Sequence, residues 1–305
     1  MKKIRIPQIV LLLLTISVSV FAQQKNSYNF SFNPDNTPKG YIQVKPDMTY
    51  SKEVGYGFDF GTTPVAINRG GKDALKAGFC TSNKPFYFSV ALPEGNYNVK
   101  ITMGDLKEAT TTTVRAESRR LMLEKVQTAP GKFETKTIAV NIRIPDIAGT
   151  THKVKLKPRE LTKLNWDDKL TLEFANTRPC INAIEITPVK DVITVYLAGN
   201  STVVDQDDEP WCSWGQMIPK YFKPEVVISN QAESGLTLGS FLGDRRLEKV
   251  LSTMKAGDYL FIEFGHNDQK EKGPNDGAYK SYTERFKTFI SEVRKKGGIP
   301  VIVTS

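Results

Sequence analysis

The sequence has few of the side chains from which metal sites and disulfide frameworks are built. Its 305 residues include three cysteines, Cys80, Cys180 and Cys212, and two histidines, His152 and His266. The cysteines form no CxxC pair and no metal-like spacing, so we expect no metal site and no cofactor. An exported protein could pair Cys80 with Cys180, and three packed thiols are the alternative that the sequence leaves open.

Runs of one charge are also missing. The formal net charge is +9, but basic and acidic residues are interspersed, and no Lys/Arg run is interleaved with aromatic residues. We therefore expect no nucleic-acid partner. The mild positive charge would suit an acidic polysaccharide and would equally suit an ordinary exported protein, so it decides little.

The sequence lacks long apolar runs, and its one short run lies near the start. Lys2, Lys3 and Arg5 precede the apolar residues 9–14, and small side chains stand before a cleavage site after Ala22. This pattern predicts a signal peptide over residues 1–22. A membrane anchor is the alternative, but a spanning helix needs about 20 apolar residues. We expect a secreted or periplasmic protein without a membrane span after cleavage.

Residues 23–190 have the pattern of an all-β domain. Residues 86–92 are aromatic and β-branched, residues 93–96 form a turn, and residues 97–103 alternate apolar with polar, which predicts a hairpin. Similar alternation recurs at residues 137–144, 170–174 and 181–186. Several short strands separated by turns predict a β-sandwich.

The pattern changes in residues 191–305. Residues 192–198 form an almost continuous apolar run, typical of a strand buried on both faces. Further strands are predicted at residues 226–228, 259–264 and 300–304, with helices between them over residues 214–222, 247–254 and 282–293. Alternating strands and helices predict parallel βαβ units and a layered α/β domain. Because Ser305 directly follows a strand, we expect this domain to be incomplete.

Three of the predicted strands end in residues suited to ester chemistry. The first runs into Gly199-Asn200-Ser201, the second into residues 230–235 with Gly235, and the third into residues 265–268 with Asn267. A serine on a tight turn exposes its hydroxyl, and a glycine amide and an asparagine amide can donate to an oxyanion. Each of these is more often a turn or cap residue, but their shared position at strand ends favours a site.

These three segments resemble the first three sequence blocks of the GDSL-type, or SGNH, hydrolases. The Ser-Thr-Val after the first block and Gly-His-Asn-Asp in the third most resemble the rhamnogalacturonan acetylesterase branch. The resemblance covers residues 194–305 and implies a three-layer, flavodoxin-like α/β fold. It implies an ester hydrolase that removes acetyl groups from pectic polysaccharide of the plant cell wall. Ser201 would be the nucleophile, and the backbone amides of Ser201 and Gly235 and the Asn267 side chain would form the oxyanion hole.

The sequence departs from the family pattern in two places. Asn200 replaces an aspartate that is not the catalytic acid, which puts little in doubt. The family's last block, Asp-x-x-His, supplies the acid and the base, and these 305 residues contain no such block. His152 falls in the predicted sandwich, and His266 belongs to the oxyanion block. We therefore expect the base beyond Ser305 and a nearly inactive chain without it.

By its position, the predicted sandwich resembles the galactose-binding-like modules attached to polysaccharide enzymes. Tyr56, Phe58, Tyr97 and Trp166 could stack on sugar or could be core aromatics. No DxDxDG-like loop supports a calcium site. Two other functions remain open: a carbohydrate-binding protein without catalysis, and an esterase acting on acetylated xylan or another glycan.

Overall fold

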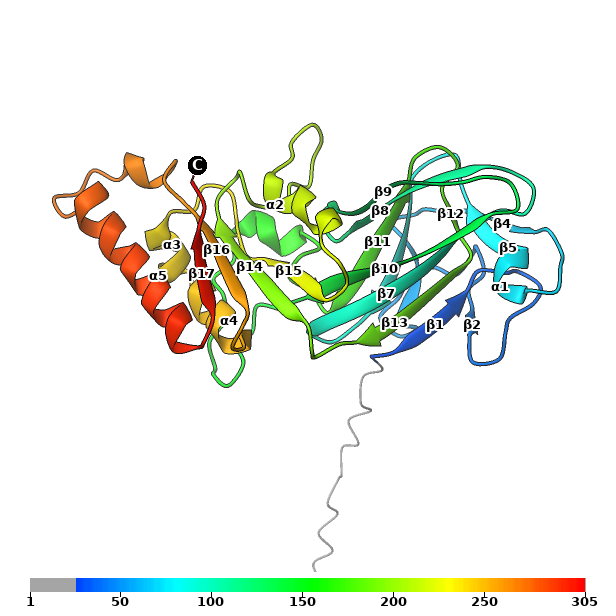
Figure 1. The fold of residues 1–305 in the computed structure, drawn as a ribbon, viewed down its shortest axis with the longest axis horizontal. Helices are drawn as coiled ribbons and strands as arrows, with labels where there is room; N and C mark the ends of the chain where they lie inside the picture. Colours follow the sequence, from blue (N-terminus) through cyan, green and yellow to red (C-terminus); the bar gives the residue numbers. More distant parts are fainter. Residues whose placement is uncertain (1–25, 305) are drawn as a thin grey trace, which may run out of the picture.

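The computed structural model describes residues 26–304, so the predicted signal peptide and its cleavage site lie outside the described residues. Figure 1 shows an elongated molecule with two β-rich parts side by side. One part consists of antiparallel sheets, and the other of a parallel sheet with helices packed on it. Within residues 26–304, no helix has the length and apolar character needed to cross a bilayer.

The first part is built from two five-stranded sheets and a small three-stranded one. In one large sheet the order is β10 (Phe133–Ile142), β7 (Gly95–Gly104), β13 (Ala183–Pro188), β1 (Tyr28–Ser31) and β2 (Ile42–Gln43). In the other it is β3 (Tyr56–Asp59), β6 (Phe86–Ala91), β11 (Lys169–Ala175), β8 (Thr110–Ala116) and β9 (Arg120–Thr128). The small sheet comprises β12 (Cys180–Ile181), β5 (Gly78–Thr81) and β4 (Val65–Asn68), and the connections include α1 (Ala74–Ala77) and the 3₁₀ helix η1 (Pro158–Thr162).

The predicted hairpin of residues 86–103 is wrong, although both of its strands exist. β6 pairs with β3 and β11, whereas β7 pairs with β10 and β13 in the opposite sheet. Each of the two strands thus pairs with two strands of its own sheet, and the turn between β6 and β7 takes the chain from one sheet to the other. The alternation of apolar residues was read correctly, since both strands turn their apolar side chains into one core.

Aromatic rings fill the space between the two large sheets. The Phe88 ring lies edge-on to Phe30, Phe32 and Phe58, with centroids 5.1, 5.2 and 5.6 Å away. This core decides a question that the sequence leaves open. Phe58 and Tyr97 are buried in this core, Tyr56 packs against it, and Trp166 is buried in a separate small cluster, so these four rings are structural.

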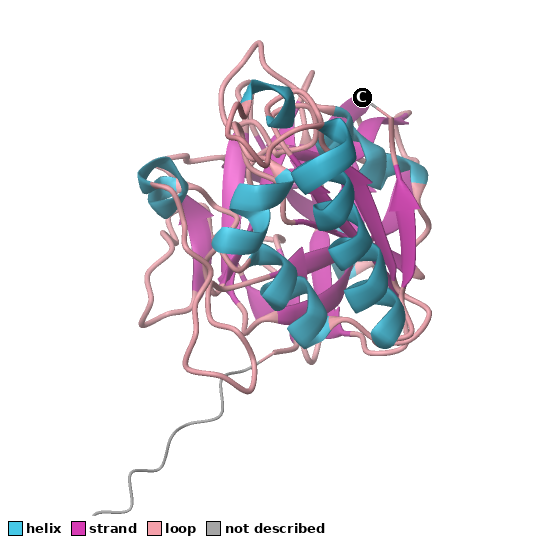
Figure 2. Cartoon of the chain, turned by 90° about the vertical axis from the view of Figure 1, so that its left-hand side faces the viewer, coloured by secondary structure: helices cyan, strands magenta, loops and turns pink. Residues whose placement is uncertain are grey.

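The second part is a four-stranded parallel sheet. Its order is β15 (Val226–Asn230), β14 (Ile193–Gly199), β16 (Tyr259–Glu263) and β17 (Ile299–Ile302). Three α-helices, α3 (Leu238–Gly243), α4 (Arg246–Thr253) and α5 (Thr283–Lys295), pack on one face, and Figure 2 shows them in front of the strands. Shorter turns of helix follow the strands: α2 (Trp214–Met217), η2 (Ile218–Tyr221), η3 (Asp268–Lys270) and η4 (Ala278–Tyr282).

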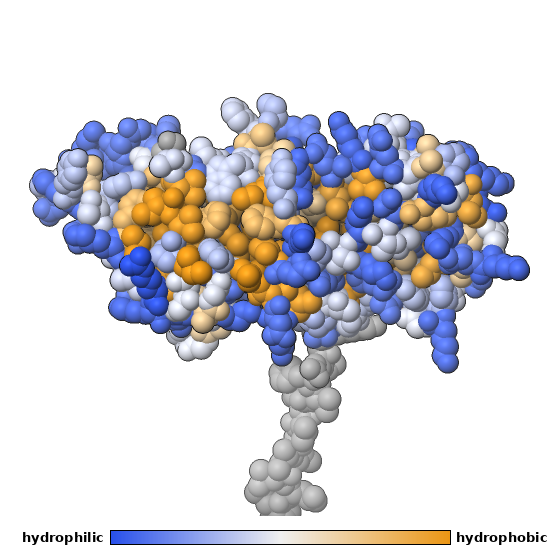
Figure 3. Space-filling view, viewed as in Figure 1, coloured by the Kyte–Doolittle hydropathy of each residue, from blue (hydrophilic) through white to orange (hydrophobic). Residues whose placement is uncertain are grey.

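The opposite face of this sheet is only partly covered. Trp214, Ile218 and Phe222 pack over β14 and β15, and the predicted helix over residues 214–222 is present as the α-helical turn α2 followed by the 3₁₀ turn η2, which contains Pro219. Ile299 and Ile302 of β17 are 42% and 55% exposed. Figure 3 shows apolar residues on the surface over this part of the molecule. Within the described residues, the expected third layer is therefore only partly present.

Buried polar contacts join the two parts. Arg120 Nε, on β9, lies 2.7 Å from Asp205 Oδ2, and Asn230 Nδ2, at the end of β15, donates to Asp205 Oδ1 at 2.8 Å. A second buried pair joins Arg246 of α4 to Glu160 of η1. These side chains are almost completely removed from solvent, so the two parts form a single packed unit.

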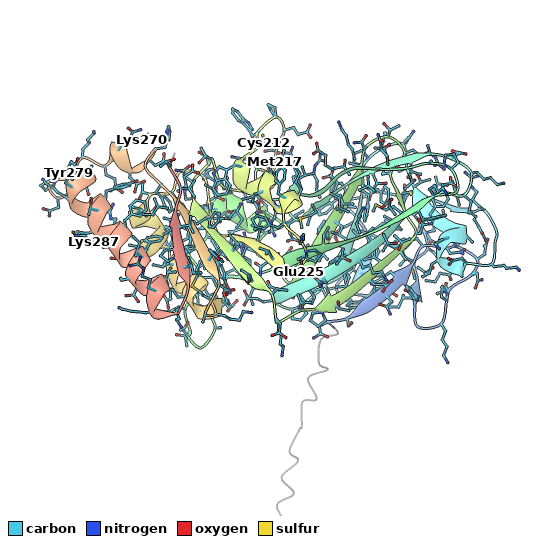
Figure 4. The ribbon with its side chains drawn as sticks, viewed as in Figure 1. Cys212, Met217, Glu225, Lys270, Tyr279 and Lys287 are labelled. Atoms are coloured by element: carbon cyan, nitrogen blue, oxygen red, sulfur yellow. The ribbon has the colours of Figure 1, made fainter. Side chains whose placement is uncertain are left out.

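Asp205→Asn is expected to lower the free energy of unfolding by about 3–5 kcal/mol, because Arg120 then remains buried without a counter-charge. Urea denaturation followed by circular dichroism measures this. The control is Lys287→Ala, which breaks a pair of two side chains that are 66% and 67% exposed (Figure 4). That loss should stay within about 0.5 kcal/mol. Equal effects of the two variants would contradict the role given to Asp205.

The three thiols are free in the structure, with Cys80 and Cys180 buried and Cys212 exposed (Figure 4). Burial raises the pKa of the Cys80 thiol to about 12 and also raises that of Cys180. Both stay protonated near pH 8, and the thiol form is unreactive. A disulfide-exchange reagent should therefore modify Cys212 alone in the native protein and all three thiols after denaturation without reductant. A single reactive thiol in denaturant would instead indicate a Cys80–Cys180 bond.

Candidate active site

The residues predicted to form the site follow three neighbouring strands of the parallel sheet. Ser201 comes two residues after β14, Gly235 five residues after β15, and Asn267 four residues after β16. β14 pairs with β15 on one side and β16 on the other, all in parallel. All three residues are therefore on loops at the carboxyl edge of one sheet, where active sites of open α/β sheets are found.

A tight turn presents Ser201. Gly199 is needed there, because a Cβ at this position would lie 2.4 Å from Val203 Cγ2 and 3.1 Å from the Glu263 carbonyl oxygen. The Ser201 carbonyl accepts a hydrogen bond from Gln206 Nε2 at 2.9 Å. The Ser201 side chain is partly exposed, and its hydroxyl has no hydrogen-bond partner among residues 26–304. This hydroxyl is free to meet a ligand.

Asn200 supports this turn from within. Its Oδ1 accepts from the Thr202 backbone N–H at 3.2 Å and from the Thr202 hydroxyl at 3.1 Å. Thr202 Oγ1 also lies 2.5 Å from Glu263 Oε1, so its one proton is shared between Asn200 and Glu263, and this contact ties the turn to β16. Because Asn200 acts here through an acceptor oxygen, an aspartate would supply the same contact. The departure at this position is thus compatible with the turn.

Side chains of the β-sandwich hold the loop that contains Gly235. The Ser234 carbonyl accepts from Lys157 Nζ at 2.6 Å and from Arg159 Nη2. Arg159 also lies 2.8 Å from Glu233 Oε1 through its Nε. Gly235 itself has a φ of +78°, in the region that favours glycine. The carbonyl held by two cations and the Gly235 N–H belong to the same peptide unit.

Asn267 and Asp268 connect the second loop to the third. Asn267 Nδ2 donates to the Leu236 carbonyl at 3.1 Å. Asp268 accepts from the backbone N–H groups of Leu238 and Gly265 at 2.8 and 3.1 Å. Burial raises the pKa of the Asp268 carboxyl. The predicted oxyanion residues are therefore on loops that bond to each other.

Among the described residues, neither histidine side chain forms a hydrogen bond with Ser201. His152 Nδ1 lies 2.7 Å from Glu248 Oε1, where a sandwich loop meets α4. His266 is exposed on the third loop and touches Gln269 through its carbonyl. Among the described residues, no side chain accepts the Ser201 hydroxyl proton, and no three Cys, His, Asp or Glu side chains group closely enough to hold a metal ion.

Sequence reasoning missed Lys157 and Arg159. They stand on either side of Pro158 in an irregular connection, where no periodicity marks them. Their partner, the Ser234 carbonyl, is a backbone group 75 and 77 residues away, and backbone acceptors carry no sequence signal. Only the packing of the sandwich on the parallel sheet reveals them.

Comparisons with known proteins bear on both parts of the chain. Residues 28–142 match the family described as beta-agarase/YXIM esterase-like, galactose-binding domain-like. The chain is 27% identical over 297 residues to the uncharacterized esterase YxiM of Bacillus subtilis (strain 168), covering 94% of this chain and 71% of that protein. The crystal structure of Bacillus subtilis YxiM, at 25% identity, superposes with a TM-score of 0.38 over 92% of this chain and 74% of that one.

Two further relatives match a shorter region. Rhamnogalacturonan acetylesterase RhgT of Bacillus subtilis (strain 168) is 39% identical over 119 residues, which is 38% of this chain and 50% of that protein. The rhamnogalacturonan acetylesterase of Emericella nidulans is 35% identical over 88 residues, 29% of this chain and 34% of that protein. The chain thus spans 50% of the length of RhgT and 34% of the length of the Emericella nidulans enzyme. The chain is therefore similar to the esterase YxiM over most of its length and to rhamnogalacturonan acetylesterases over a shorter region, and its residues 28–142 match a galactose-binding-domain-like family.

Proposed function

We propose that this protein is a carbohydrate esterase of the SGNH type that removes acetyl groups from rhamnogalacturonan in plant cell-wall pectin. The observation that carries the proposal is the position of Ser201, Gly235 and Asn267 on adjoining loops at one sheet edge, with the Ser201 hydroxyl free. The names of the relatives support the substrate class. Export through the predicted signal peptide would bring the enzyme to this substrate.

The mechanism uses an acetyl-enzyme. The Ser201 hydroxyl oxygen attacks the ester carbonyl carbon while a base takes its proton. The carbonyl oxygen becomes an oxyanion, which accepts from the backbone N–H groups of Ser201 and Gly235 and from Asn267 Nδ2. Asn267 Nδ2 carries two hydrogens and gives one to the Leu236 carbonyl, so the second serves the oxyanion. The sugar hydroxyl then leaves with a proton, and water releases acetate from Ser201.

The proposal requires a base that the described residues do not place beside Ser201. Without one, a serine hydroxyl is a weak nucleophile near neutral pH. We propose that an Asp-x-x-His segment outside these 305 residues supplies it, and that the chain alone has little activity. A catalytically silent carbohydrate-binding protein is the second candidate, favoured by the missing base. An esterase for acetylated xylan is a variant of the first.

Ser201→Ala tests the nucleophile. Acetate release from acetylated rhamnogalacturonan and acetylated xylan is measured for the 305-residue chain and for any longer product of the gene that adds Asp-x-x-His. We expect the longer product to prefer rhamnogalacturonan and to lose about 10³-fold or more of its rate with Ser201→Ala. Ser291→Ala, an exposed serine on α5, is the matched control. Undiminished hydrolysis by Ser201→Ala rules out the assignment, and a longer product without activity favours the binding protein.

Lys157 is expected to act as a positioning residue for the Gly235 N–H. Its ammonium group orients the shared peptide and draws electrons toward the Ser234 oxygen, which strengthens the N–H as a donor. Lys157→Met should lower kcat of the active form by about 10-fold with KM little changed, less than the 10²–10³-fold lost with an oxyanion donor itself. Lys155→Met, at an exposed position nearby, is the control.

The pH profile separates this role from a structural one. Burial, and then the charge of Arg159, lower the pKa of Lys157, so its proton is lost at a lower pH than usual for lysine. The wild-type kcat should therefore fall on the alkaline side, and Lys157→Arg, which stays charged, should keep it. Identical alkaline limbs in the wild type and Lys157→Arg would contradict the role.

A further inference from the structure

A cavity of about 670 Å³ lies between the two parts of the protein. Its walls include Phe60, Tyr87, Ser118 and Arg119 from the sandwich and Trp211 and Ser234 from the second part. A volume of this size is in the range of about 300–1,000 Å³ that small-ligand sites occupy. Neither part forms this cavity alone.

The cavity adjoins the candidate active site. Ser234, in its wall, directly precedes Gly235. Gln206, also in its wall, donates from Nε2 to the Ser201 carbonyl at 2.9 Å. A chain-like ligand with its ester at Ser201 would therefore extend naturally into this cavity.

Its aromatic residues are unlike those of the core. Phe60 is 52% and Trp211 67% exposed, although large rings usually lie inside. The Phe60 ring stands edge-on to Tyr87 at 5.3 Å between centroids, and Lys169 Nζ lies 5.2 Å from its centre. The ring is thus held in place with much of its surface open. Open aromatic faces beside polar groups suit a sugar, whose ring has apolar C–H faces and a polar rim.

One buried hydroxyl in the wall lacks a partner. Ser118 is 3% exposed, and among the described residues its Oγ has no hydrogen bond. Such atoms are rare, and each costs about 1–3 kcal/mol when left unsatisfied. This oxygen is closed off from solvent, so the hydroxyl is part of the wall and does not itself contact a ligand. Burial also raises the pKa of the neighbouring Glu117 carboxyl to about 8, and its Oε1 accepts a hydrogen bond from the Thr171 N–H at 3.0 Å.

The backbone of the wall is strained at Phe60. Phe60, Glu117 and Arg119 have φ of 53°, 54° and 63°, in the left-handed region. A bulky residue such as phenylalanine rarely adopts this conformation, which costs about 1–3 kcal/mol. Glu117 and Arg119 belong to the three-residue loop between β8 and β9, where left-handed residues form the turn, so only Phe60 is unusual in this respect.

The charges of the wall cancel. Lys163 lies between Asp207 and Glu233 at 3.1 and 3.2 Å, and Arg119 lies 3.3 Å from Glu209. Arg159, the remaining cation of the wall, lies 2.8 Å from Glu233, so each cation that lines the cavity within the described residues has a carboxylate partner. This favours an uncharged sugar residue, recognised by its ring face and its hydroxyls.

We propose that this cavity between the two parts binds an uncharged sugar residue of the polysaccharide whose acetyl ester lies at Ser201. The inference rests on the proposed function, because the proposed function names the polysaccharide that carries the ester. It makes the β-sandwich a direct part of the substrate site through Phe60 and Tyr87. Binding needs no base and no turnover, so it is measured separately from catalysis.

Calorimetry on the 305-residue chain with Ser201→Ala tests the proposal, with oligosaccharides of acetylated rhamnogalacturonan as the probe. Trp211→Ala and Phe60→Ala should each raise Kd by about 3- to 10-fold. Tyr279→Ala is the control, since Tyr279 is 98% exposed at the far end of the molecule (Figure 4).

The outcomes separate the two proposals. No binding by the parent chain, or equal Kd values for all variants, overturns the cavity as a sugar site. Oligogalacturonides of the same length should bind more weakly, and equal binding overturns the preference for an uncharged residue. If Trp211→Ala loses binding while no form of the protein releases acetate, the sugar site in the cavity is supported and the proposed esterase activity is rejected.

Discussion

Asp205 is buried at the junction of the two parts, and its two carboxylate oxygens serve different partners. One accepts from Arg120 of the sandwich and the other from Asn230, at the carboxyl end of β15. Asn230 Nδ2 also donates to the carbonyl of Val203, in the turn that presents Ser201. The Asp205 carboxylate thus connects the sandwich to β15 directly, and to the turn that presents Ser201 through Asn230. In a medium of low dielectric constant, such a contact is strongly directional and costly to break.

The parts of the fold that follow from local periodicity could be predicted. The apolar run at β14 and the helical spacing of α4 and α5 depend on neighbours in the sequence, and both were found. The hairpin predicted for β6 and β7 was wrong, because the partners of each strand depend on which distant strands lie beside it. The apolar spacing of residues 214–222 predicted a helix there but did not predict its change from α to 3₁₀ geometry at Ile218.

In the candidate site, too, the residues that depend on local sequence could be predicted, and those that depend on distant segments could not. Ser201, Gly235 and Asn267 each follow a strand, and adjacency of the strands brings their loops to one edge. The residues that act on those loops from the sandwich could not be predicted. Lys157 and Arg159 donate hydrogen bonds to a backbone carbonyl. Phe60 and Trp211 come from distant segments of the sequence and line the same cavity. Contacts of this kind depend on how two separately patterned parts dock, and no local pattern records docking.

The two cations on the Ser234 carbonyl have a consequence for anyone who wishes to shorten or recombine this protein. Excising the sandwich, or replacing it with another carbohydrate-binding module, would leave the Gly235 peptide without the groups that orient it, and would expose Arg246 and Asp205 to water. The sandwich is therefore not a detachable accessory. Engineering of substrate range by module exchange must carry over the connection that contains Lys157 and Arg159.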